Sequence, residues 1–130
     1  MSTSSVREVM KPPTTTIEPD GHLAAAAYLM KHNHDSALVV VTDDTREPVA
    51  MITEADITRA VARGRNLEDT RIRQVVTTKP VTVQADTSVQ HAIHLMLAEG
   101  VQHLPVVEGR RLVGMVELAD LCRANLMWLV

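Results

Sequence analysis

The chain repeats itself, and this repeat constrains its fold more than any other feature of the sequence. The segment EPVAMITEAD at residues 47–56 returns as RLVGMVELAD at residues 111–120. The match continues upstream, where Met30 aligns with Met96. An internal repeat of this kind indicates two copies of one supersecondary unit, which bury their apolar faces by packing together. We therefore predict two similar units packed with pseudo-twofold symmetry. Any site between them should then occur as a near-symmetric pair.

Both copies predict the same order of elements. In the second copy, a β-branched segment indicates a strand, capping oxygens at 86–88 start a helix, and Gly100 ends it. Two apolar runs separated by a polar turn follow, and then a final helix. The predicted elements are 16–17, 23–31, 37–41, 49–52 and 54–62 in the first copy, and 80–83, 89–99, 104–107, 112–116 and 118–127 in the second. The sequence therefore predicts an α/β fold in which each copy has the order β-α-β-β-α.

Polar residues mark the boundary between the copies. The segment RGRN at 63–66 is polar, and its glycine ends the preceding helix. We predict a first unit over 6–62, a linker over 63–70 and a second unit over 71–126. The chain then ends in an apolar tail over 127–130, which we expect to pack on its own domain or between subunits.

Composition and charge argue against several classes of function. The net charge of −3 gives no electrostatic reason to expect nucleic acid, whose binders carry clustered positive charge. No segment reaches the roughly 18 apolar residues of a membrane span, and residues 1–10 lack the apolar core of a signal peptide. The single cysteine, Cys122, excludes an internal disulfide and fits a reducing cytoplasm. We expect a cytoplasmic protein that contacts neither nucleic acid nor membrane.

The motif TEAD at 53–56 lies where a strand ends and a helix begins, and it has two interpretations. In the first, Thr53 caps the helix and Asp56, at the third helical position, completes a capping box. In the second, the helix N-terminus and the Thr53 hydroxyl hold a phosphate, while Asp56 accepts both hydroxyls of a ribose. Arg59 and Arg123 each follow an aspartate by three residues, and they either hold the carboxylate or bind phosphate directly. Local sequence leaves these interpretations open.

Two tandem units of this kind resemble a pair of CBS domains, together called a Bateman module. The resemblance rests on an apolar strand followed by a Gly-hydrophobic-hydrophobic-Thr-x-x-Asp strand end. The second copy shows it in VQHLPVV at 101–107 and VGMVELAD at 113–120, and the first in SALVVV at 36–41 and VAMITEAD at 49–56. The resemblance covers nearly the whole chain, over residues 6–125. It implies that the Thr and Asp of the motif hold the phosphate and ribose of an adenosine nucleotide.

The resemblance further implies two composite sites, each shared between the copies. Site one joins the TEAD motif of the first copy to the early strand and the Pro-Val strand of the second. Its residues are Thr53, Asp56, Thr82, Val83, Gln102, His103 and Pro105. Related proteins often carry His or Arg at 102–103, so His103 is a candidate phosphate ligand when it is protonated. Alternatively, His103 only covers the edge of its strand.

Site two is the symmetry-related arrangement, and it is poorer in ligating groups. Its residues are Thr16, Ile17, Ser36, Ala37 and Asp120. Glu117 stands where site one has Thr53, which removes a hydroxyl donor and places a negative charge against a phosphate. None of the partners from the first copy carries a positive charge. We therefore expect an asymmetric module, in which site one binds a nucleotide and site two is empty, weaker or takes an uncharged ligand.

These observations favour a regulatory protein rather than an enzyme. No motif in the sequence assembles a nucleophile, a base and an oxyanion donor. We expect no required cofactor, and an adenine nucleotide as regulatory ligand, with AMP or ADP first, then ATP, then S-adenosylmethionine. Bateman modules commonly pair through their helices, so the expected partners are a second copy in a homodimer and an effector protein.

Two other interpretations belong to different classes. The first is a structural or protein-interaction module with a vestigial cleft, favoured by Glu117 and by the lack of an arginine at 102–103. The second is a small metal-dependent enzyme built on His91 and His94, which lie one helical turn apart. No acidic or cysteine ligand stands beside these histidines in the sequence, so a surface role is the better interpretation.

Overall fold

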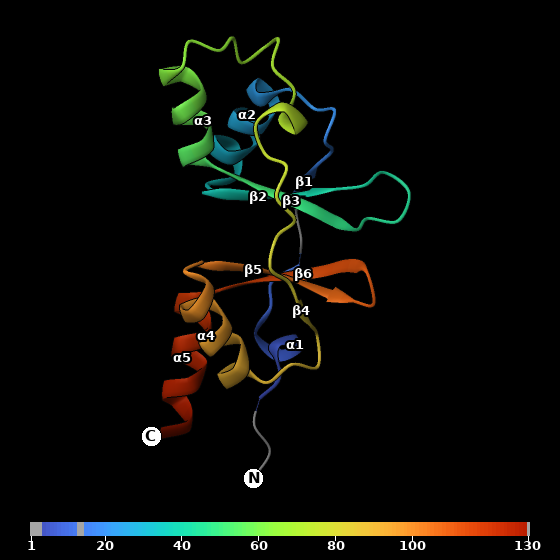
Figure 1. The fold of residues 1–130 in the computed structure, drawn as a ribbon. Helices are drawn as coiled ribbons and strands as arrows, with labels where there is room; N and C mark the ends of the chain where they lie inside the picture. The colour runs from blue at the N-terminus through green and yellow to red at the C-terminus, as the bar shows by residue number, and fades with distance from the viewer. Residues whose placement is uncertain (1–3, 13–14, 130) are drawn as a thin grey trace. The chain divides into compact units, whose positions relative to one another are not determined.

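The computed structural model describes residues 4–12 and 15–129, with side chains described as far as residue 126. These residues form two compact units, which we call the first unit (15–80) and the second unit (4–12 together with 81–129). Each unit contains one three-stranded sheet and its own helices (Figure 1). The structure confirms the α/β class and the order β-α-β-β-α predicted for each copy.

The first unit places two helices on one face of its sheet (Figure 1). Its elements are β1 (Thr16–Ile17), α2 (Leu23–Asn33), β2 (Ala37–Val41), β3 (Pro48–Thr53), α3 (Glu54–Ala62) and the 3₁₀ turn η1 (Ile72–Gln74). The central strand β2 pairs in parallel with β1 and antiparallel with β3. Residues of β3 alternate between buried and half-buried, since the helices cover one face of the sheet. The buried stripe of α2 is Leu23, Ala26 and Met30, at helical spacing.

The second unit has the same topology with one added helix at its start. Its elements are α1 (Val6–Val9), β4 (Val83–Gln84), α4 (Val89–Glu99), β5 (His103–Glu108), β6 (Arg111–Glu117) and α5 (Leu118–Leu129). The strands follow the order β4-β5-β6, with β5 parallel to β4 and antiparallel to β6. Gly100 ends α4 in the left-handed region at φ 68°, as the sequence predicts. His34 takes the same role after α2 at φ 57°.

The early strand of the second unit is shifted relative to its predicted position. The sequence predicts residues 80–83, whereas β4 is Val83–Gln84. By the repeat, Thr82 would lie opposite Pro105, and a proline has no N–H to give to the parallel ladder. The pairing therefore begins at Val83, opposite Val106. The Gln84 side chain then holds the β5–β6 turn, because its amide exchanges two hydrogen bonds of 3.1 Å with the backbone of Gly109.

The N-terminal segment (residues 4–12) belongs to the second unit. The backbone N–H of Val6 donates to the Thr87 carbonyl at 2.8 Å, and the Val6 side chain is fully buried. Further on, Lys11 and Met115 exchange two backbone hydrogen bonds of 2.9 Å, so the segment adds a short bridge to β6. The sequence predicts a first unit over 6–62, because that range follows the order of the repeat along the chain. In the structure, the start of this range lies in the second unit instead, because one apolar side chain and exposed backbone groups pack there.

At Gly114 of β6, the N-terminal segment packs closely against the sheet. A Cβ atom at this position would lie 2.5 Å from Met10 Sδ and 3.0 Å from the carbonyl oxygen of Lys11. The matched position in the first unit is Ala50, which is buried in β3. The absence of a side chain at Gly114 therefore leaves the room that the N-terminal segment occupies.

The end of the chain continues the last helix. Backbone of α5 extends through Leu129, so the predicted tail over 127–130 is helical as far as it is described. The contacts predicted for the tail side chains lie outside the described residues. Over residues 4–12 and 15–129, none of the helices is long and apolar enough to cross a bilayer.

Candidate functional site

The junction of β3 and α3 forms the centre of site one in the first unit. Thr53 ends β3 in an extended conformation and is the N-cap of α3. Its Oγ1 accepts a hydrogen bond from the backbone N–H of Asp56 at 3.3 Å, and the Asp56 carboxylate accepts one from the Thr53 N–H at 2.8 Å. The capping box predicted from the sequence is confirmed.

The Asp56 carboxylate is held by three hydrogen bonds. Its Oδ2 accepts from the Thr53 N–H and from Thr53 Oγ1 at 3.0 Å, and its Oδ1 accepts from Arg59 at 3.0 Å. The predicted i,i+3 partnership with Arg59 is therefore confirmed. The side chain of Asp56 is 20% exposed. A carboxylate offers about four lone-pair sites, so Asp56 keeps acceptor capacity for a ligand hydroxyl.

Residues that the sequence assigns to site two lie beside Thr53 within the first unit. Ala37 is paired with Thr53 across the β2–β3 ladder. The carbonyl oxygen of Ser36 accepts the backbone N–H of Glu54 at 3.1 Å. This bond uses one of the free N–H groups in the first turn of α3, so the helix end is only partly open to a ligand.

A small pocket of about 90 Å³ opens on the helical side of Asp56. Three arginines, Arg59, Arg63 and Arg65, line it together with Asp56. Guanidinium groups of this kind suit phosphate recognition, because their planar forks bind two oxygens at once. Sequence reasoning missed Arg63 and Arg65, which fall at the predicted linker. The triplet RGR, which directly follows α3, is the sequence feature that could have identified them.

The matching junction of the second unit contains different chemistry. Glu117 ends β6 and lies opposite His103 in the ladder, with His103 Nε2 at 4.0 Å from Glu117 Oε1. The carbonyl oxygen of Gln102 accepts the Leu118 N–H at 3.0 Å, as Ser36 does for Glu54 in the first unit. Two predicted residues of site one, Gln102 and His103, therefore neighbour the start of α5 in their own unit.

Asp120 carries two positive partners. Its Oδ1 accepts from Arg123 at 2.9 Å, which confirms the predicted i,i+3 partnership in this unit. The ammonium group of Lys11 lies 3.4 Å from Asp120 Oδ2. Sequence reasoning missed Lys11, because it belongs to the predicted first unit and lies far from Asp120 along the chain. The Asp120 side chain is 15% exposed, slightly less than its counterpart Asp56.

The remaining residues of site one are parts of the second sheet. Val83 is buried and pairs with Val106, and Pro105 is buried in β5. At these two positions a ligand can contact backbone and apolar groups, because neither side chain forms hydrogen bonds. Thr82 precedes β4 and is half-buried.

The strand residues of site two, Thr16 and Ile17, line a pocket of about 480 Å³ in the first unit. Its rim is acidic, with Glu18, Asp20 and Asp43, together with Arg46. The hydrogen bond between the Glu18 and Asp43 carboxyl groups raises the pKa of Glu18, and the negative charge of Asp43 acts in the same direction.

We expect Glu18→Gln to stabilise the protein slightly at neutral pH. The raised pKa of Glu18 means that its carboxyl favours folding while protonated, and this contribution is lost as pH rises through the raised pKa. Glutamine keeps a hydrogen-bond donor for Asp43 and removes the repulsion between the two carboxylates. Thermal unfolding should show a higher melting temperature for Glu18→Gln at pH 7 and the same value as wild type near about pH 4. An equal difference at both pH values would contradict the prediction.

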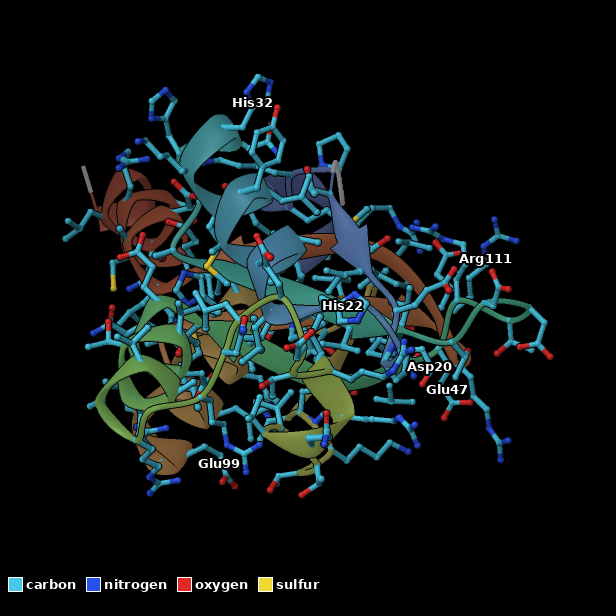
Figure 2. All side chains as sticks on the ribbon, turned by 90° about the horizontal axis from the view of Figure 1, so that it is seen from above. Asp20, His22, His32, Glu47, Glu99 and Arg111 are labelled. Atoms are coloured by element: carbon cyan, nitrogen blue, oxygen red, sulfur yellow. The ribbon has the colours of Figure 1, made fainter. Side chains whose placement is uncertain are left out.

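The histidines that could suggest a metal site are exposed. Figure 2 shows His32 at the periphery of α2, where its ring stacks on Tyr28 with centroids 5.5 Å apart. His91 and His94 are exposed on α4. Among the residues that the structure describes, no three His, Cys, Asp or Glu side chains gather as a metal site would need.

Comparison with known proteins identifies the family. The sequence model of the CBS domain matches the chain twice, over residues 6–63 and 72–126. This chain belongs to the CBS domain family. The CBS domain-containing protein YhcV of Bacillus subtilis is 34% identical, over 91% of this chain and 83% of its own length. The chain spans 64% to 83% of the length of three curated relatives, so it is not equivalent to the whole of each.

Solved CBS structures share the fold. A CBS domain protein of Pyrobaculum aerophilum, complexed with AMP, is 27% identical, covers 97% of this chain and 98% of its own, and superposes with a TM-score of 0.85. Hypoxic Response Protein I, solved with two coordinated zinc ions, is 28% identical over 92% of this chain and 98% of its own, with a TM-score of 0.83. The likeness confirms the tandem CBS pair expected from the repeat.

Each predicted site draws on both compact units, and the composite sites stay predictions. What the structure establishes is the half of each site within one unit. The Thr53–Asp56–Arg59 cluster and the arginine-lined pocket belong to the first unit. The Asp120–Arg123–Lys11 cluster and its neighbour Glu117 belong to the second.

Proposed function

We propose that this CBS pair is a regulatory module that binds an adenosine nucleotide through Asp56. AMP or ADP is the first expected ligand, followed by ATP and S-adenosylmethionine. The observation that carries the proposal is the Asp56 carboxylate, held rigidly at the start of α3 with one acceptor site to spare and arginines beside it. The AMP complex of the Pyrobaculum aerophilum protein supports it, since that protein shares the fold over nearly the whole chain.

The chemistry of the cluster suits a ribose phosphate. A ribose offers two hydroxyl donors: one meets the free acceptor site of Asp56, and the second takes the place of the Thr53 hydroxyl when that hydroxyl turns to the phosphate. The phosphate needs cations or free N–H groups, and Arg63 and Arg65 are available in the same unit. In the proposed composite site, Thr82, Val83, Gln102, His103 and Pro105 complete the binding surface from the second unit.

A nucleotide regulates only if it binds two states of the protein with different affinity. In this proposal, binding favours one arrangement of the two CBS units, and a partner protein responds to it. We further propose a homodimer in the cytoplasm, in which a second copy of the chain completes the regulatory assembly.

Thermal unfolding with a panel of ligands tests the proposal. We expect AMP or ADP at about a millimolar to raise the melting temperature by several degrees, because a ligand at a hundredfold excess over its dissociation constant adds roughly 2.7 kcal/mol to stability. GTP is the matched control for ATP and GMP is the one for AMP, since each keeps the ribose and phosphates and changes only the base. No shift with AMP, ADP, ATP or S-adenosylmethionine would contradict the proposal.

The alternative is a structural or protein-interaction module whose cleft binds nothing. The observation that favours it is the completeness of the capping box, because Thr53, Arg59 and Asp56 satisfy one another without a ligand. The two functions differ in one measurement. A structural role predicts that Asp56→Ala lowers stability equally with and without nucleotide, whereas a binding role predicts that it also reduces the stabilisation by ligand to what site two alone provides.

A further inference from the structure

The two repeated aspartates differ in how their second carboxylate oxygen is satisfied. Asp56 Oδ2 accepts two hydrogen bonds from Thr53, one from the backbone and one from the hydroxyl. Asp120 Oδ2 is buried and accepts no hydrogen bond from any residue that the structure describes. Glu117 stands where the first unit has Thr53 and brings no hydroxyl, which accounts for the loss of one of these two bonds.

Among the residues that the structure describes, the charged group that pairs with this oxygen comes from the N-terminal segment. Lys11 Nζ lies 3.4 Å from Asp120 Oδ2, an ion pair without hydrogen-bond geometry. The Lys11 backbone is fixed by its two 2.9 Å bonds to Met115. Its side chain is 65% exposed, so the ammonium is held loosely on a flexible stem and can move to another anion.

We propose that Lys11 is the phosphate-recognising residue of site two, and that it makes this site selective for a phosphorylated nucleoside over the free nucleoside. Asp120 Oδ2 has the acceptor capacity that ribose hydroxyls need. When these hydroxyls bind Asp120, Arg123 still neutralises the carboxylate, and Lys11 turns to the phosphate. The inference rests on the proposed function, and it replaces the expectation that site two lacks a cation.

Other charges near Asp120 make Lys11 necessary. Glu117 is the last residue of β6 and would repel a phosphate, and its side chain is 47% exposed. His103 lies 4.0 Å from Glu117 and offsets that charge only when protonated. Arg123 is engaged with the other carboxylate oxygen at 2.9 Å. Lys11 is therefore the cation best placed to move from Asp120 to a ligand phosphate.

The test isolates site two and varies the charge at position 11. Calorimetric titrations of AMP and of adenosine are made with Asp56→Ala, in which site one is disabled, and with the same protein carrying Lys11→Met. We expect Lys11→Met to weaken AMP binding about fivefold and to leave adenosine binding the same or slightly tighter. Lys11→Arg should retain the preference for AMP, because it keeps the charge.

Arg7→Met is the matched control. Arg7 lies on the same N-terminal segment and pairs with Glu108, away from Asp120, so its replacement removes the same charge from the same segment. It should leave the ratio of AMP to adenosine affinity unchanged. Unchanged melting temperatures without ligand would show that the segment stays in place in both variants.

The outcomes separate this inference from the proposed function. The wild-type protein could bind AMP through Asp56, while Lys11→Met leaves the AMP preference of site two unchanged. That result would overturn only the role of Lys11. The role of Lys11 would also be overturned if Asp56→Ala did not bind AMP while the wild-type protein still bound it at site one. Failure of wild type to bind any adenosine ligand would overturn the proposed function, and the inference with it.

Discussion

The double variant Thr53→Val/Asp56→Ala should lose nucleotide binding at site one. The change removes the carboxylate that would accept the ribose hydroxyls and the hydroxyl that holds it in place. Hydrogen bonds to a charged group contribute about 1.5–3 kcal/mol each, so the loss of two such bonds weakens binding by at least about 100-fold. Calorimetric titration with AMP at 25 °C measures this loss directly.

Because both residues also cap α3, the variant loses stability as well. Removal of an N-cap costs about 1 kcal/mol, and titration is therefore done well below the melting temperature of the variant. Thr53→Ser keeps the hydroxyl and should bind nearly as wild type. Asp120→Ala removes the equivalent carboxylate from the second unit and should leave the tighter site almost intact. Equal losses from Asp56→Ala and Asp120→Ala would contradict the asymmetry between the sites.

Gly114→Val should release the N-terminal segment from β6. A side chain at this position enters the space of Met10 Sδ and of the Lys11 carbonyl, which lie 2.5 Å and 3.0 Å from the first atom of the new side chain. The methionine can move aside, but the backbone oxygen cannot do so without breaking its pairing with Met115. We expect a loss of about 3 kcal/mol in the free energy of unfolding, measured by urea denaturation.

Hydrogen exchange locates the effect of this variant. The amides of Val6, Lys11 and Met115 donate the bonds that dock the segment, and their protection should fall sharply in Gly114→Val. Gly114→Ala should show a smaller loss, and Met10→Ala combined with it should recover part of the stability. Full protection of these amides in Gly114→Val would show that the sheet accommodates the side chain in another way.

Much of the fold within each unit could be predicted from local patterns. The apolar spacing in α4 and the glycine at its end predicted its bounds, because helix periodicity and a left-handed cap are properties of a few neighbouring residues. The capping box at Thr53 is local for the same reason. The position of β4 was less predictable, since it depends on the proline that lies opposite in β5.

The candidate site shows the same division between local and distant contacts. Thr53, Asp56 and Asp120 stand in a repeated motif, and the partnership of each aspartate with the arginine three residues later follows from helix geometry. Lys11 could not be found in this way. It reaches Asp120 only because the apolar side chain of Val6 is buried in the second unit and the following backbone pairs with β6.

By itself, the amino-acid sequence determined the repeat, the order of elements in each copy and the family to which the chain belongs. These follow from the spacing of apolar and capping residues, which acts over one or two turns of chain. The ion pair of Lys11 with Asp120, and the room that Gly114 leaves for the N-terminal segment, exist only in the folded unit. They arise where segments distant in the chain meet, because packing and charge contacts are set by distance in space rather than along the sequence.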